Sequence, residues 1–132
     1  MCKIAEFTLE SLCSNVKIDP SIDELAKQYP VGCSEVKSNN LQYQLNKPIK
    51  GYIEFEYNSF YFIWDVNPSG KTGMEQGSPI IGLGKSLQES YDAFLIDLIH
   101  TFDDCVETPD DRWHQSAKVY VSIMKSLLYE KG

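Results

Sequence analysis

Residues 52–66 constrain the fold of this chain more than any other segment, because they predict a β-hairpin. Apolar residues alternate with glutamates over residues 52–57, and an alternation of period two is typical of a strand with one buried face. Asn58-Ser59 is typical of a tight turn, and residues 60–66 provide the returning strand. A chain with this segment must therefore build an antiparallel sheet.

The returning strand is apolar on both faces, which is typical of a strand with neighbours on either side. Two further segments, residues 41–45 and 80–83, have the composition of short strands. We therefore expect an antiparallel sheet of three to four strands. The polar, glycine-rich segment 67–79 reads as a long loop, and a loop of about a dozen residues is often functional.

Helices are expected on both sides of this sheet segment. Residues 4–16 have loosely helical apolar spacing, and Ser21 begins a capping box that predicts a short helix ending before Pro30. A second capping box predicts a helix over residues 86–104, and Thr108-Pro109 predicts the start of a last helix that runs to about Tyr129.

We thus predict one compact α+β domain over residues 1–132, with N-terminal helices, the antiparallel sheet and a C-terminal antiparallel helical hairpin.

The helix over residues 86–104 has a core stripe and an opposite face that differs from it. Glu89, Ala93, Ile96 and His100 lie opposite the apolar stripe. Ile96 is an apolar side chain between acids, so we expect a second element to cover it; the alternative is that Ile96 is exposed.

The negative charge of the chain is concentrated beside this helix. The net charge is 12 − 19 = −7, and residues 86–111 carry eight acids and neither lysine nor arginine. A field of one sign repels nucleic acid and anionic lipid and attracts basic partners. The simpler interpretation is a solvated helix face. No stretch of about 18 apolar residues is present, so we expect no membrane-spanning helix.

The cysteines, Cys2, Cys13, Cys33 and Cys105, have no zinc-finger or redox-motif spacing. Glu6 stands where a signal peptide would have its apolar core, so we expect a cytoplasmic protein with reduced thiols.

No catalytic or cofactor motif is complete. Gly84-Lys85-Ser86 precedes a helix, but Pro79 stands where a phosphate-binding loop needs its first glycine. His100, His114 and nearby acids are residue types that bind zinc, manganese or iron, yet acids at a helix start need no metal to explain them. We therefore predict no metal, no cofactor and no enzymatic activity.

A small acidic domain without a catalytic set is typical of a binding module. In size and charge over the whole chain, it resembles the immunity proteins of contact-dependent growth inhibition and related bacterial antitoxins. That resemblance implies a stoichiometric inhibitor of a basic toxin domain, such as a nuclease, and an acidic surface complements such a site. The expected contacts lie in the acidic segment: Glu89, Asp92, Ile96, Asp103, Asp104, Glu107, Asp110 and Asp111.

Two alternatives remain open. One is a small-molecule-binding protein or small enzyme that uses the loop at 67–79 as a lid. The other is an inhibitor from a phage or a defence system that mimics the charge of nucleic acid.

Overall fold

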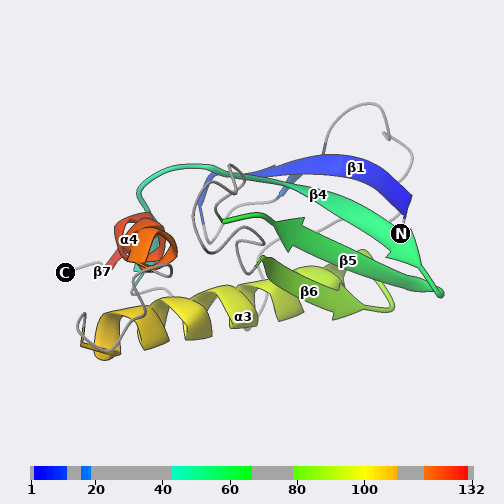
Figure 1. The fold of residues 1–132 in the computed structure, drawn as a ribbon. Helices are drawn as coiled ribbons and strands as arrows, with labels where there is room; N and C mark the ends of the chain where they lie inside the picture. The colour runs from blue at the N-terminus through cyan, green and yellow to red at the C-terminus, as the bar shows by residue number, and fades with distance from the viewer. Residues whose placement is uncertain (1, 12–15, 19–42, 67–78, 110–117, 131–132) are drawn as a thin grey trace.

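A computed structural model describes residues 2–11, 16–18, 43–66, 79–109 and 118–130, and they form an α+β fold (Figure 1). The main sheet is antiparallel and has five strands in the order β2-β1-β4-β5-β6. Its strands are β1 (Cys2–Leu9), β2 (Lys17–Ile18), β4 (Ile49–Glu56), β5 (Ser59–Trp64) and β6 (Ile80–Gly84). The α+β class and the antiparallel sheet are as predicted, but the predicted count of three to four strands is wrong, because β1 and β2 add to the sheet among the described residues.

The hairpin of β4 and β5 is also as predicted, although its turn lies one residue earlier. Tyr57 and Asn58 have φ values of 53° and 58°, and Glu56 pairs with Ser59 across the turn. Positive φ at both central residues is the geometry that a two-residue hairpin turn requires. β5 lies between β4 and β6, which explains why it is apolar on both faces.

The helix predicted over residues 4–16 is wrong, because its first part belongs to β1, which ends at Leu9; residues 12–15 lie outside the described ranges. Ala5, Phe7 and Leu9 are buried on one face while Glu6 is exposed between them, so the true period is two. Pairing with β4 along the length of β1 overrides the weak helical spacing. The predicted helix that begins at Ser21 lies outside the described residues.

One long helix, α3 (Leu87–Glu107), covers one face of the sheet, beneath β5 and β6 (Figure 1). It is the helix predicted over residues 86–104, and it continues to Glu107. The Ser86 hydroxyl accepts a hydrogen bond from the backbone N–H of Glu89 at 3.1 Å, as the capping box predicts. The opposite face of α3 is turned away from the sheet.

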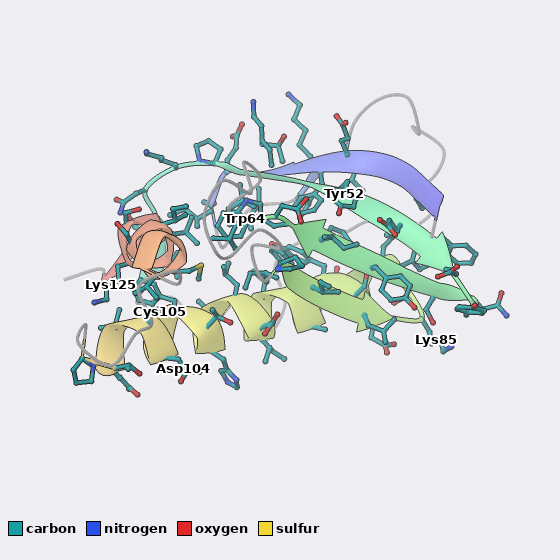
Figure 2. All side chains as sticks on the ribbon, viewed as in Figure 1. Tyr52, Trp64, Lys85, Asp104, Cys105 and Lys125 are labelled. Atoms are coloured by element: carbon teal, nitrogen blue, oxygen red, sulfur yellow. The ribbon has the colours of Figure 1, made fainter. Side chains whose placement is uncertain are left out.

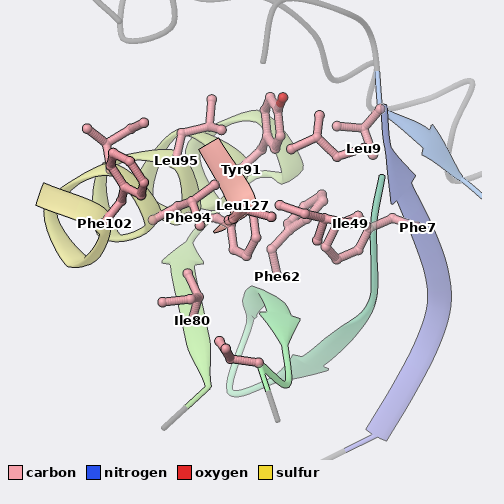
Figure 3. Packing of buried hydrophobic residues seen from close by; sticks show 14 of the residues in the cluster. Phe7, Leu9, Ile49, Phe62, Ile80, Tyr91, Phe94, Leu95, Phe102 and Leu127 are labelled. Carbon is pink, nitrogen blue, oxygen red and sulfur yellow. The ribbon is translucent and has the colours of Figure 1, made fainter. Parts of the chain in front are cut away.

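Aromatic rings fill the space between α3 and the sheet (Figure 3). The Phe62 ring centroid lies 4.9 Å from that of Phe7 and 5.6 Å from that of Tyr91. Phe94 packs edge-on against Phe7, with ring centroids 5.7 Å apart. Burying rings of this size contributes much of the hydrophobic stabilisation, so this cluster fixes how α3 lies on the sheet.

The C-terminal region differs from the predicted helical hairpin. The helix α4 (Lys118–Leu127) ends before Tyr129, and Leu128–Glu130 forms β7. β7 pairs with β3 (Tyr43–Leu45), so the strand predicted over residues 41–45 belongs to a separate two-stranded sheet. In Figure 1 α4 is seen nearly end-on while α3 runs across the view, so the two helices cross instead of lying antiparallel.

Asn46 explains why α4 stops where it does. Its backbone N–H donates to the carbonyl oxygen of Leu127 at 2.8 Å, and its Nδ2 donates to that of Ser126 at 2.7 Å. These bonds satisfy carbonyl groups that a helix end leaves without partners.

Among the described residues, no helix combines the length and apolar character needed to cross a membrane.

Candidate protein-binding site

The outward side of α3 carries a continuous acidic face. At 100° per residue, its members lie within about 80° of arc, and a helix of this length extends over about 32 Å. We call this strip the acidic face and define it by Glu89, Asp92, Ile96, His100, Asp103 and Glu107. Five of the eight residues predicted to contact a partner are therefore brought together on one surface.

Ile96 lies in the middle of the acidic face and is 42% exposed. The expectation that a second element covers Ile96 is therefore wrong, and the alternative reading is the observed one. The exposure follows from the wheel of α3, because its buried stripe faces the sheet and Ile96 points the other way. A single exposed apolar side chain is ordinary, but acids on both flanks give this one a distinctive setting.

Asp104, another residue predicted to contact a partner, lies outside the acidic face. Asp104 is exposed but lies to one side of the acidic face, and its charge acts on the Cys105 thiol, as does that of Lys125 of α4 (Figure 2). Asp92 lies on the face and accepts a hydrogen bond from Nε2 of Gln88 at 2.9 Å. The predicted contacts Asp110 and Asp111 lie outside the described residues.

The charge of Asp104 affects the pKa of the neighbouring Cys105 thiol. Burial raises the pKa of the Cys105 thiol above its ordinary value, the Asp104 carboxylate raises it further, and the Lys125 ammonium lowers it. Cys105 is buried and carries no disulfide. This arrangement keeps the thiol protonated, so it is unsuited to act as a nucleophile.

Asp97 is a functional candidate that the sequence analysis did not single out. Its Oδ2 accepts a hydrogen bond at 3.3 Å from the backbone N–H of Ile81 in β6. The contact ties the flank of α3 to the outer strand of the sheet. No pattern in the helix sequence predicts this contact, because the contact depends on which residue of β6 lies beside Asp97.

The outer strand β6 carries two exposed apolar side chains. Ile81 is 41% exposed and Leu83 is 53% exposed, whereas Ile80 is buried against α3. No strand pairs with the outer side of β6 within the described part of the chain. An unpaired edge next to an acidic helix is therefore a second surface feature beside the acidic face.

The sheet face opposite α3 carries a smaller polar group. The Tyr52 side chain is hydrogen-bonded to Asp65, and burial, followed by the charges of Asp65 and Glu54, raises the pKa of Tyr52 above its ordinary value (Figure 2). The charged neighbours of Tyr52 within the described part of the chain are the carboxylates of Asp65 and Glu54. Two carboxylates beside a neutral phenol do not by themselves form a catalytic set.

The residues considered for a phosphate loop have ordinary structural roles, and those considered for a metal site do not form a cluster among the described residues. Lys85 donates from Nζ to Oγ of Ser59 at 3.1 Å, and Ser86 caps α3, so Gly84-Lys85-Ser86 is a turn and a helix start. No three histidine, cysteine or acidic side chains within the described ranges lie close enough together to hold a metal ion. His100 is exposed on the acidic face, and His114 lies outside those ranges.

A scan of protein-family models matches no family, and searches of curated proteins and of solved structures find no similar chain.

Proposed function

We propose that this protein is a non-catalytic, stoichiometric inhibitor that binds a basic protein domain, of the kind that immunity proteins and antitoxins neutralise. The observation that carries the proposal is the position of Ile96, exposed in the centre of the acidic face of α3. An apolar residue surrounded by charges matches the usual arrangement of an interface, which has an apolar centre and a polar rim.

The negative charge of the acidic face indicates a partner with a positively charged surface. Residues 86–111 contain acids without lysine or arginine, so this side of the molecule attracts positively charged surfaces. Complementary charge speeds association and disfavours wrong partners, while a buried apolar contact holds the complex. A nuclease active site is basic because it binds phosphates, so it is a fitting target.

The direct test is affinity capture from the native organism with the tagged protein at low and moderate salt, followed by mass spectrometry. We expect one basic protein at near 1:1 stoichiometry, captured less efficiently as salt screens the acidic face. The captured protein should then be purified, and its activity should be abolished when one equivalent of this chain is added.

Two matched variants make the test specific for the face. Glu107→Lys and Glu10→Lys each change the net charge from −7 to −7 + 2 = −5, and both glutamates are exposed, but only Glu107 lies on the acidic face. A lysine at the C-terminal end of α3 also favours the helix dipole, so weaker binding by Glu107→Lys would not reflect a weaker helix. Equal capture by both variants would show that the acidic face is not the binding surface.

A further inference from the structure

The outer edge of β6 combines exposed apolar side chains with backbone groups that face away from β5. Within the described residues, β6 ends the sheet beside α3, and no strand pairs with its outer side. Its side chains Ile81 and Leu83 are 41% and 53% exposed. Natural proteins usually protect such an edge with lysine, proline or a bulge, and none of these lies within β6 itself.

At Ile81 and Leu83 of β6, the backbone N–H and C=O groups point away from β5. The N–H of Ile81 reaches Asp97 on the outer flank, so it is directed away from β5. In an antiparallel ladder, alternate residues direct their N–H and C=O groups to the same side, so those of Leu83 also point outward. Asp97 occupies one of these donors, and the bond of 3.3 Å is long for an N–H donor to a carboxylate.

The sheet face with Ile81 and Leu83 is apolar at this edge, whereas the α3 side carries Asp97. This difference determines which side chains an added strand should have on each face. A strand added to β6 would place alternate side chains next to Ile81 and Leu83, on the face opposite α3. The remaining side chains would lie on the α3 side, next to Asp97. The first set should be apolar and the second set basic.

We propose that β6 binds an extended segment of the partner protein by strand addition, with apolar and basic side chains alternating along that segment. This inference rests on the proposed function, since it assigns the partner's mode of attachment. A second copy of this chain is a poorer occupant, because pairing β6 with β6 would bring two acidic α3 flanks together in molecules of net charge −7.

The test uses a synthetic probe: a capped peptide of about seven residues that alternates valine and lysine. Strand addition should protect the backbone N–H of Leu83 from hydrogen exchange. With peptide at ten times its Kd, about nine-tenths of the sites are filled, so exchange at Leu83 should slow about tenfold. A matched peptide methylated at the valine nitrogens keeps every charge but loses the donors that face β6, and it should give no protection.

Two protein variants complete the design. Leu83→Lys places a cation at the edge and should weaken peptide binding at least about tenfold. Val106→Lys is its control, because Val106 is also 53% exposed and the charge change is the same, but it lies at the far end of α3. This variant should bind like the wild type.

Three outcomes would overturn the proposal. Equal binding of the methylated peptide would mean that charge alone attracts the probe. Unchanged binding by Leu83→Lys would place the peptide elsewhere. Dimerisation of the wild type, lost in Leu83→Lys and kept in Val106→Lys, would assign the edge to a second copy. The peptide experiment requires no toxin, so its result is independent of the capture experiment that tests the proposed function.

Discussion

Gly82 of β6 and Ser90 of α3 are in direct backbone contact: a Cβ built at Gly82 would overlap the carbonyl oxygen of Ser90 and the backbone of Phe94. The helix can lie this close to the sheet only because β6 has glycine at this position. This close approach also brings Asp97 to the backbone of Ile81. A Cβ at Gly84 would likewise overlap the backbone of Ser90 and Glu89, so the position of β6 against α3 depends on two glycines.

Gly82→Ala should therefore destabilise the protein by at least about 1–3 kcal/mol, because α3 must move away from β6 to admit the methyl group. Urea denaturation measures the change in the free energy of unfolding. The neighbouring substitution Leu83→Ala is the control, because Leu83 is largely exposed and its truncation should cost less than about 1 kcal/mol. Equal losses for the two variants would contradict the close contact.

Ser86→Ala should lower the free energy of unfolding by about 0.5–2 kcal/mol. The serine hydroxyl accepts a hydrogen bond from the Glu89 N–H at the start of α3, and alanine leaves that donor without a partner. Ser86→Asp should restore most of the lost stability, since a carboxylate caps the same donor and favours the helix dipole. Failure of the aspartate to rescue stability would argue against the capping role.

Local sequence patterns predicted the hairpin of β4 and β5 and the helix α3, because each has a strong period of its own. They failed for β1, whose alternating apolar residues include the small Ala5 and whose partner residues in β4 lie 49 − 9 = 40 to 55 − 2 = 53 positions away along the chain. They also failed at Leu128, where pairing with Leu45 ends the helix. Contacts between distant segments decided each of these cases.

The same distinction applies to the candidate site. The acidic face could be predicted, because helical periodicity alone places Glu89, Ile96 and Glu107 together. The role of Asp97 could not be predicted, because it depends on how α3 lies against β6. Exposure of Ile96 was left open by the sequence, since the wheel shows the direction of a side chain but not what covers it.

Ile96 and Phe94 should respond very differently to truncation. Phe94→Ala should cost about 3–5 kcal/mol, because the ring is fully buried against Phe7 and Phe62. Ile96→Ala should cost less than about 1 kcal/mol, because the side chain is already 42% exposed. Thermal unfolding measures both values. A large loss for Ile96→Ala would mean that this residue serves folding, and its place in the proposed interface would lose support.

Tyr52 should ionise at a higher pH than an ordinary tyrosine side chain. Burial and the carboxylates of Asp65 and Glu54 raise its pKa, since each of them disfavours the phenolate. An alkaline titration of phenolate absorbance, compared between the wild type and Tyr52→Phe, isolates this group. The missing absorbance step should lie above pH 10.0, the ordinary pKa of tyrosine. A step at or below that pH would contradict the partly buried, acid-flanked setting.

Cys105 should make the protein less stable as the pH rises above 9.0, the ordinary pKa of a thiol. Its pKa is raised in the folded state, so folding favours the protonated thiol; this contribution is complete below the unfolded pKa and is lost as the pH rises through the folded pKa. Stability measured by urea denaturation from about pH 8 upward should therefore fall less steeply in Cys105→Ala. Asp104→Asn should also reduce the slope, because it removes a carboxylate that raises this pKa, whereas Lys125→Met should increase it. Identical slopes for these two variants would contradict the placement of Cys105 between opposite charges.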